Sequence, residues 1–157
     1  MTATEWPTID VEVRVLEHAR DLALPSYATD GAAGVDLLAA IDGAAPIELR
    51  PGVRIAVPTG LCLAIPVGYE GQVRARSGRA LREGLAVING PGTIDADFRG
   101  ELCVLLANLG AAPITLYRGD RIAQLVFCPV VRAQWRTVAT LDDTKRGAGG
   151  FGSTGTR

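Results

Sequence analysis

The chain has 157 residues, 48% of them hydrophobic and 21% charged, and a formal net charge of −1 at pH 7. This length favours one domain with its own core, and the balanced charges argue against a nucleic-acid surface or a polybasic membrane patch. Its apolar runs are shorter than a membrane span, and the N-terminus lacks the pattern of a signal peptide. We therefore expect no nucleic-acid and no membrane partner.

The cysteines and the histidine limit the possible chemistry. Cys62, Cys103 and Cys128 each lie within an apolar run, without CxxC spacing, so neither a disulfide framework nor a zinc site is predicted. We expect them to be reduced and buried, in a cytoplasmic protein. His18, the only histidine, follows Glu17 in an expected turn. Mechanisms of the Ser-His-Asp or Cys-His type would need it and are disfavoured.

Most of the predicted elements are short strands. Apolar and polar residues alternate from 9 to 15, as in a half-buried strand. Short runs bounded by Gly, Pro or Asp predict strands at 35–40, 47–49, 53–57, 61–65, 71–75, 85–88, 102–107, 114–117, 122–131 and, as one more candidate, 134–141. This series indicates an all-β sandwich or barrel. One short helix is expected at 77–83, with Ser77 as N-cap and Gly84 closing it.

The segment 89–101 reads Asn-Gly-Pro-Gly-Thr-Ile-Asp-Ala-Asp-Phe-Arg-Gly-Glu and joins two apolar runs. This composition predicts a hairpin with a long loop. The loop carries the amide of Asn89, the carboxylates of Asp95 and Asp97, and the ring of Phe98. These groups can read a base, position a water and stack on a ring. An ordinary acidic turn explains the segment equally well at this point.

The next strand, 102–107, is apolar on both faces, whereas strands in small monomeric sandwiches usually alternate. Two explanations are open: deep burial within the domain, or burial against identical subunits around a symmetry axis. The periodicity does not separate them.

The character of the chain changes at Asp142, which divides it into a β domain (1–141) and a C-terminal arm (142–157). Five glycines fall within 146–155, so the arm is expected to be mobile by itself. Its backbone N–H groups, hydroxyls and arginine could also wrap an anion. A disordered end is the ordinary interpretation of such a tail, but a linker needs neither Arg146 nor Phe151.

Five pieces of the chain, taken in order, resemble the five motifs of the trimeric dUTP diphosphatases (dUTPases). They are 33–37 (Ala-Gly-Val-Asp-Leu), 76–78 (Arg-Ser-Gly), 89–101, 119–125 (Gly-Asp-Arg-Ile-Ala-Gln-Leu) and 146–155. The resemblance implies a jelly-roll-like β fold, a homotrimer with sites between subunits, and an arm that closes over a neighbour's site. It also implies hydrolysis of dUTP to dUMP and pyrophosphate with Mg²⁺, which limits uracil incorporation into DNA and supplies dUMP for dTMP synthesis.

The resemblance assigns roles to single residues. It makes Asp95 the general base that holds the attacking water and Gln124 a phosphate-contacting amide, which as a bare pattern could also be a polar residue on an exposed strand face. Asp36 would organise the metal and phosphate side through water or Arg76, without a direct protein ligand to Mg²⁺. The remaining phosphate cradle would be Arg76, Ser77 and Gly78.

The nucleoside and the arm are assigned in the same way. Backbone groups near Thr93, Ile94 and Cys103, with the Asn89 amide, would pair with the uracil edge, and Phe98 would lie beneath the deoxyribose. In the arm, Phe151 would stack on uracil and Arg146 would pair with the γ-phosphate. The expected ligands of the other phosphate oxygens are Gly152, Ser153 and Thr154.

The chain departs from the family pattern in three places. Ala75 and Arg79 replace a common Pro and Leu, and Phe98 replaces a common tyrosine. We expect Arg79 to face solvent and Phe98 still to refuse a ribose 2′-hydroxyl. Asp120 and Arg121 are interpreted as a structural ion pair, and Asp97 as loop structure.

Two rival functions remain. A dCTP deaminase has a related fold, but its catalytic glutamate aligns with Leu105, which cannot move protons. A non-catalytic nucleotide-binding trimer on the same scaffold is the other rival. The presence of Asp95, Arg76, Ser77 and Gln124 argues against it.

Overall fold

The computed structural model describes residues 6–43, 45–151 and 153. Besides a 3₁₀ helix (η1, Glu17–Ala19) and one α-helix (α1, Ser77–Glu83), it contains strands only. They are β1 (Glu12–Val15), β2 (Val35–Leu38), β3 (Ile47–Leu49), β4 (Arg54–Ala64), β5 (Tyr69–Arg74), β6 (Leu85–Val87), β7 (Gly92–Ile94), β8 (Glu101–Asn108), β9 (Ile114–Leu116) and β10 (Arg121–Pro129). In this part of the chain no helix has the length and hydrophobicity to cross a membrane.

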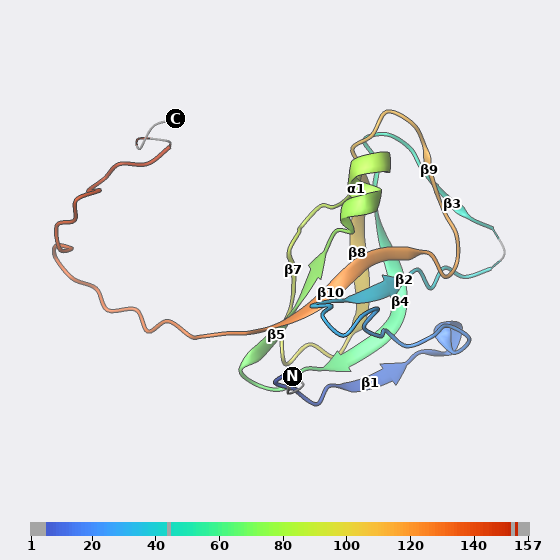
Figure 1. Cartoon of the computed structure of the whole chain (residues 1–157), viewed down its shortest axis with the longest axis horizontal. Helices are drawn as coiled ribbons and strands as arrows, with labels where there is room; N and C mark the ends of the chain where they lie inside the picture. Colours follow the sequence, from blue (N-terminus) through green and yellow to red (C-terminus); the bar gives the residue numbers. More distant parts are fainter. Residues whose placement is uncertain (1–5, 44, 152, 154–157) are drawn as a thin grey trace.

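The strands form two four-stranded sheets with the orders β1-β4-β8-β6 and β2-β10-β5-β7, and a separate pair, β3-β9. Figure 1 shows β4 and β8 behind β2, β10 and β5. One core lies between the sheets, since Val57 and Val104 come from the first and Leu37 and Leu125 from the second, and all four are buried. Side chains from facing sheets that share a core define a sandwich. The predicted all-β class is confirmed, as a sandwich and not as a closed barrel.

The strands expected at 53–57 and 61–65 are one strand, β4, with a register shift between Pro58 and Cys62. Gly60 lies in this irregular stretch with a φ of +71°. A Cβ at this position would come within 2.0 Å of the Ala19 Cβ, so only glycine permits η1 to pack there. The bulge therefore bends one long strand where the sequence pattern reads a break.

The helix has the predicted bounds, but its N-cap is a different residue. Ser77 is its first helical residue, and Arg76 is the N-cap, without a side-chain hydrogen bond. The prediction of Ser77 as N-cap is therefore wrong. Gly84 closes the helix as predicted, in the left-handed conformation, and a side chain there would lie 2.3 Å from the backbone nitrogen of Gly110.

The predicted hairpin is present and more elaborate than expected. β6 pairs with β8 in antiparallel register, but residues 92–94 of the loop form β7, which pairs with β5 of the other sheet. The loop thus crosses from one sheet to the other and returns. A three-residue strand within a Gly/Pro-rich segment carries no clear pattern, because its partner is remote in sequence.

β8 alternates in burial where its sequence is apolar on both faces. Leu102, Val104 and Leu106 are buried, whereas Cys103 and Leu105 are exposed. Of the three free cysteines only Cys62 is buried, while Cys128 is half-buried and Cys103 exposed, so the expectation that all three are buried is confirmed for Cys62 alone. One apolar face of β8 is therefore open in the single chain.

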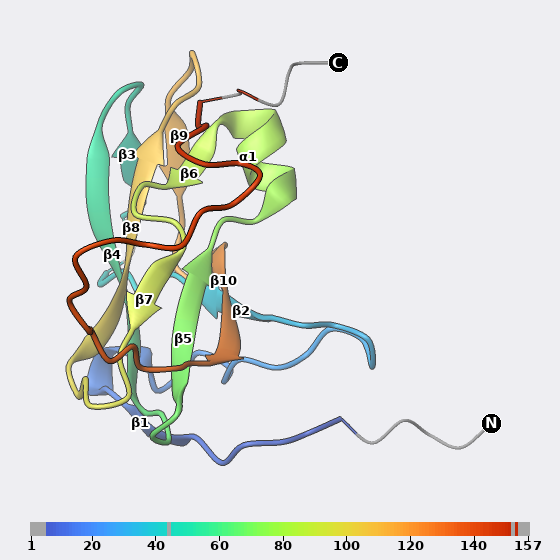
Figure 2. The same ribbon diagram turned by 90° about the vertical axis from the view of Figure 1, so that its left-hand side faces the viewer.

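The chain after β10 does not form the candidate strand at 134–141. Every residue from 129 to 148 is exposed, and no strand is assigned between 130 and 148. Figure 1 shows this segment running away from both sheets, and Figure 2 shows it from its own side. Its apolar residues, such as Trp135, which is 95% exposed, have no surface of the same chain to pack against.

Candidate active site

Three of the five motif pieces meet where α1 begins. Asp36 of β2 lies opposite Gln124 of β10, which in turn lies opposite Arg74 at the end of β5. Two residues after Arg74, Arg76 places its Nε 2.8 Å from Oδ1 of Asp36. The predicted link between Asp36 and Arg76 is present. Half-buried Gln124 shares this corner of the sheet.

A second arginine approaches the same carboxylate. Nη1 of Arg121 lies 3.4 Å from Oδ2 of Asp36, so one carboxylate stands between two guanidiniums. The side chains of Arg76 and Arg121 are 30% and 61% exposed, against 18% for Asp36. The excess positive charge therefore faces solvent at the start of α1. Such a surface suits a phosphate or another compact anion.

Asp120 and Arg121 do not pair with each other, which corrects the predicted ion pair. Arg121 contacts Asp36, and Asp120 contacts Nη1 of Arg79 at 3.6 Å. Asp120 precedes β10 and Arg121 is its first residue, and their side chains reach different partners. The Arg121 contact ties β10 to β2, and the Asp120 contact ties the turn before β10 to α1.

Contrary to the prediction, the Arg79 side chain does not face solvent. Its side chain is 12% exposed, and its Nε and Nη2 donate to Oε2 of Glu83 at 3.0 and 2.7 Å. The i,i+4 spacing on α1 brings Glu83 within reach, and Asp120 holds the third nitrogen. The sequence carried both acidic partners, but only the fold brings Asp120 to α1.

The loop 88–100 presents its polar groups outward. Asn89 folds over Gly92, whose Cβ would lie 2.9 Å from the Asn89 amide nitrogen. Asp95 is exposed, and its carbonyl accepts the N–H of Phe98 at 3.1 Å in a turn. The Phe98 ring lies over Gly100, where a Cβ would come within 2.7 Å of it. The loop thus exposes the Asp95 carboxylate and, three residues later, part of the Phe98 ring.

Asp95 and Arg76 are not brought together within one chain. Ile94 pairs with Gly71 near the beginning of β5, so Asp95 lies at that end, whereas Arg76 follows the other end. The six residues of β5 span roughly 20 Å at about 3.3 Å per residue. One chain therefore carries two separate parts of the candidate site.

Two strands at the loop keep an open edge. In the described chain β7 pairs with β5 alone, and β6 pairs with β8 only from Leu106 onward. These strand pairings leave some backbone N–H and C=O groups without a partner strand. They lie near Thr93 and Ile94 on β7 and near Cys103 on β8. Such edges can exchange hydrogen bonds with a planar base.

The arm residues are remote from both parts. Nε of Arg146 donates to the carbonyl of Gly149 at 2.8 Å, and Ser153 N–H donates to the carbonyl of Gly150 at 2.9 Å. Phe151 is fully exposed, with a φ of +49°. The predicted phosphate ligands Gly152 and Thr154 lie outside the described residues.

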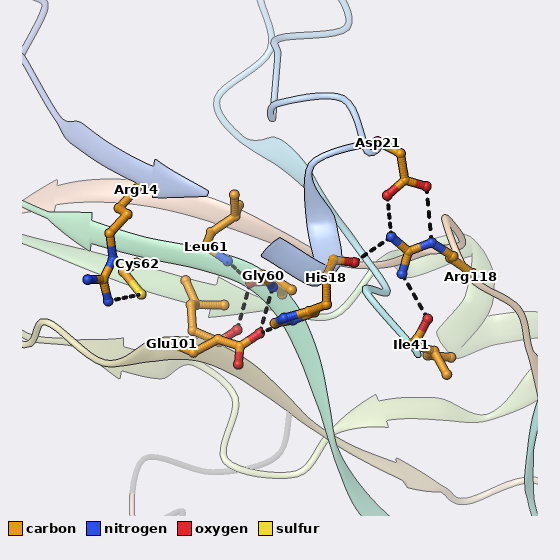
Figure 3. A network of polar contacts seen from close by, with 11 residues as sticks. Arg14, His18, Asp21, Ile41, Gly60, Leu61, Cys62, Glu101 and Arg118 are labelled. Atoms are coloured by element: carbon orange, nitrogen blue, oxygen red, sulfur yellow. Dashed lines mark hydrogen bonds and ion pairs between the residues drawn. The ribbon is translucent and has the colours of Figure 1, made fainter. Parts of the chain in front are cut away.

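A polar network that the sequence did not reveal supports the beginning of β8 (Figure 3). Oε1 of Glu101 lies 3.0 Å from Nε2 of His18 and accepts the N–H of Gly60 at 2.7 Å. Arg118 donates to the carbonyls of His18 and Ile41 and to the Asp21 carboxylate. Separations of 77 to 100 residues between Arg118 and its partners, and of 83 between His18 and Glu101, explain why no local pattern showed it.

The network and its surroundings shift three pKa values. The hydrogen bond from Arg118 lowers the pKa of Asp21, and the same bond raises the pKa of Arg118. Burial, and then the charge of Glu101, raises the pKa of the Cys103 thiol. A thiol with a raised pKa is a poor nucleophile at neutral pH, which is consistent with a backbone role for Cys103.

Comparison with known proteins gives a concordant result. A family model described as dUTPase matches residues 20–155. A deoxyuridine 5′-triphosphate nucleotidohydrolase of Maricaulis maris is 49% identical over 150 residues, which cover 96% of this chain and 99% of the relative.

Solved structures show the same fold. The dUTPase of Staphylococcus bacteriophage 80alpha with dUPNHPP has a TM-score of 0.83 at 24% identity, covering 94% of this chain and 99% of that one. A mutant dUTPase of phage phi11, described with a structural Mg(II) ion, has a TM-score of 0.73 at 23% identity and covers 84% and 98%. Since the family model spans most of the chain and the relative nearly all of it, this chain belongs to the dUTPase family.

Proposed function

We propose that this protein hydrolyses dUTP to dUMP and pyrophosphate, and thereby limits uracil incorporation into DNA and supplies dUMP. Membership of the dUTPase family supports this activity. The observation that carries it is the corner at α1, where Arg76, Arg121 and Gln124 surround Asp36 with excess positive charge. A triphosphate is the compact polyanion that such a corner would bind.

Water attacks the α-phosphate, and Asp95 accepts the proton. A new bond forms between the water oxygen and the α-phosphorus, while the bond to the bridging oxygen of the β-phosphate breaks and pyrophosphate leaves. An exposed carboxylate suits this task because it orients the water and accepts its proton. Asp97, two residues away, serves the loop and not the reaction.

The phosphates bind at Arg76, Ser77, Gly78 and Gln124. Mg²⁺ would be held by phosphates and water, because Asp36 already faces two guanidiniums. Asp36 Oδ1 is buried and lies 2.8 Å from Arg76 Nε, so Asp36 would act on the phosphate side through Arg76. When bound, the ion neutralises phosphate charge.

The enzyme is a homotrimer with sites between subunits. Asp95 and Arg76 lie at opposite ends of β5, so a complete site needs a second copy to bring them together. The exposed face of β8, with Cys103 and Leu105, offers apolar surface for the contact between copies. A stable monomer at micromolar concentration in light scattering would contradict this assembly.

Uracil binds at the open edges of β7 and β8. Backbone groups near Thr93, Ile94 and Cys103, with the Asn89 amide, pair with the base edge, and Phe98 lies beneath the sugar. Fixed donors and acceptors reject cytosine because a mismatch leaves buried groups unpaired.

The arm closes over a neighbour's site: Phe151 stacks on uracil and Arg146 pairs with the γ-phosphate. The other arm ligands are Gly152, Ser153 and Thr154.

The activity is tested by measuring pyrophosphate release from dUTP, dCTP and UTP side by side, with ammonia release from dCTP. We expect pyrophosphate from dUTP alone. Asp95→Asn should lower kcat by about 10²- to 10⁴-fold, whereas Asp97→Asn, the matched control on the same loop, should stay close to wild type. Ammonia from dCTP would support a deaminase. Binding of dUTP without any product would support the non-catalytic alternative.

A further inference from the structure

We propose that Arg79 is a positioning residue that sets the place of the phosphate-binding residues of α1 by anchoring this helix to Asp120. The proposal rests on the proposed function, since it concerns the same phosphate site. It arises from a departure from the family pattern, in which leucine is common at this position.

Apolar packing does little to hold α1. The helix has seven residues, none of them buried, and its N-cap makes no side-chain hydrogen bond. A helix this short is marginal without tertiary contacts. The C-terminal end is tied by its backbone, since the Gly84 carbonyl accepts the N–H of Leu109 at 2.9 Å. At the other end, the orientation of Arg76, Ser77 and Gly78 therefore depends on the contacts that α1 makes through its polar side chains.

Two ion pairs tie the first turn of α1 to β2 and to Asp120, the residue before β10. Arg76 contacts Asp36, which also contacts Arg121. One turn further along the helix, Arg79 contacts Asp120, the residue before Arg121. Two ties on one helix face fix a rotation that a single tie leaves free.

The far end of the second tie is itself rigid. Oδ2 of Asp120 accepts the N–H of Tyr117 at 3.1 Å, and its carbonyl accepts the N–H of Ala39 at 2.9 Å. Glu83 holds the Arg79 guanidinium from the helix side at 2.7 Å. With a side chain that is 12% exposed, Arg79 is shielded from solvent more than a surface ion pair. Leucine at this position could not make the tie.

The test compares Arg79→Leu, Arg79→Lys and Asp120→Asn. Asparagine retains an oxygen for the Tyr117 N–H but removes the charge that attracts Arg79. We expect Arg79→Leu and Asp120→Asn each to raise KM for dUTP, and the Kd for the non-hydrolysable analogue dUPNHPP, about ten-fold, with kcat within about two-fold, since ground-state phosphate binding is lost. Arg79→Lys should restore most of the affinity.

The double variant Arg79→Leu/Asp120→Asn should be no weaker than either single variant, because both remove one coupled interaction. Arg50→Leu removes the same charge at a pair with Glu48, whose two side chains are 76% and 57% exposed, and should change neither constant. Thermal unfolding and light scattering check that all variants fold and assemble alike.

Three results would overturn the proposal: wild-type affinity in Arg79→Leu, additive losses in the double variant, or a loss in Arg79→Leu without one in Asp120→Asn. The last would mean that Arg79 touches the nucleotide itself. A wild-type protein that releases no pyrophosphate from dUTP would refute the proposed function. The Kd values for dUPNHPP would still decide the role of Arg79.

Discussion

Phe98 departs from the family pattern at the nucleoside side of the candidate site, since it lacks the hydroxyl of the common tyrosine. Its ring is 43% exposed and lies over Gly100, so it retains the flat face that a deoxyribose would cover. A ring in this place excludes a 2′-hydroxyl by contact, without a hydrogen bond. Packing against glycine keeps the ring in position.

We therefore predict strong discrimination against UTP by the wild-type protein. Phe98→Ala should reduce the ratio of kcat/KM for dUTP to that for UTP by about ten-fold or more, because the steric exclusion is removed. Phe98→Tyr serves as the control and should keep the ratio. Comparable kcat/KM values for UTP and dUTP in the wild type would contradict the steric account.

Asp21 and Arg118 give a prediction on pH. The hydrogen bond from Arg118 lowers the pKa of Asp21 in the folded state. A depressed folded pKa means that the pair contributes stability above the unfolded pKa, and that this contribution is lost as pH falls through the folded pKa. Asp21→Asn should lower the Tm slightly at pH 7, and the difference from wild type should shrink below about pH 4.

The effect should be small and should weaken with salt, because the Asp21 side chain is 69% exposed. Differential scanning calorimetry from pH 7 to pH 3 measures it. A difference between the variants that grows on acidification would show that another group controls the acid response.

At the residue scale, the sequence identified candidate side chains better than it identified the residues that they contact. The link between Asp36 and Arg76 was predicted because the two motifs resemble a known pair. Arg79 was placed in solvent because a helix pattern does not show Asp120, which lies 41 positions further along the chain. Ion pairs between remote elements carry no local signal, so only the fold reveals them.

The arm is the element whose function is most separable from the fold. Its exposed residues run away from both sheets (Figure 1), so the core does not depend on them. Truncation before Arg146 should leave the Tm of the domain nearly unchanged and reduce turnover strongly, because Phe151 and Arg146 no longer close the site.

Far-ultraviolet circular dichroism and thermal unfolding verify the fold of the truncated chain, and pyrophosphate release measures its turnover. Alanine at Trp135, in the exposed segment between β10 and the arm, tests whether that segment also contributes. Unchanged turnover after truncation would refute the closing role of the arm.

At the element scale strand existence was predictable and strand pairing was not. Alternation and turn residues located most strands, but β4 was read as two because Gly60 looks like a break. β7 was missed because three residues carry too little pattern. The candidate strand at 134–141 is absent because β propensity alone does not supply a partner strand within the chain.

The whole molecule explains why β8 is apolar on both faces. One face enters the core through Leu102, Val104 and Leu106, while Cys103 and Leu105 remain open. Sequence periodicity left deep burial and subunit contact as equal alternatives. In the described chain the second face is not buried within the domain, so of the two alternatives the contact between copies is the one that we propose.

The proposed assembly of copies also decides which chains would contribute residues to one site. Arg76, the proposed phosphate ligand, and Asp95, the proposed base, lie at opposite ends of β5, so each copy would contribute the base to one site and the phosphate corner to another. Two variants that are each inactive for a different reason should then complement each other in a mixed assembly.

Mixing Asp95→Asn and Arg76→Ala chains by joint unfolding and refolding tests this central claim most directly. If the two residues act in one site from different copies, random mixing gives both native residues in about a quarter of the sites, and dUTP turnover should recover to about that fraction of wild type. Turnover that stays at the level of the separate variants, in a mixture shown to contain mixed trimers, would contradict the account.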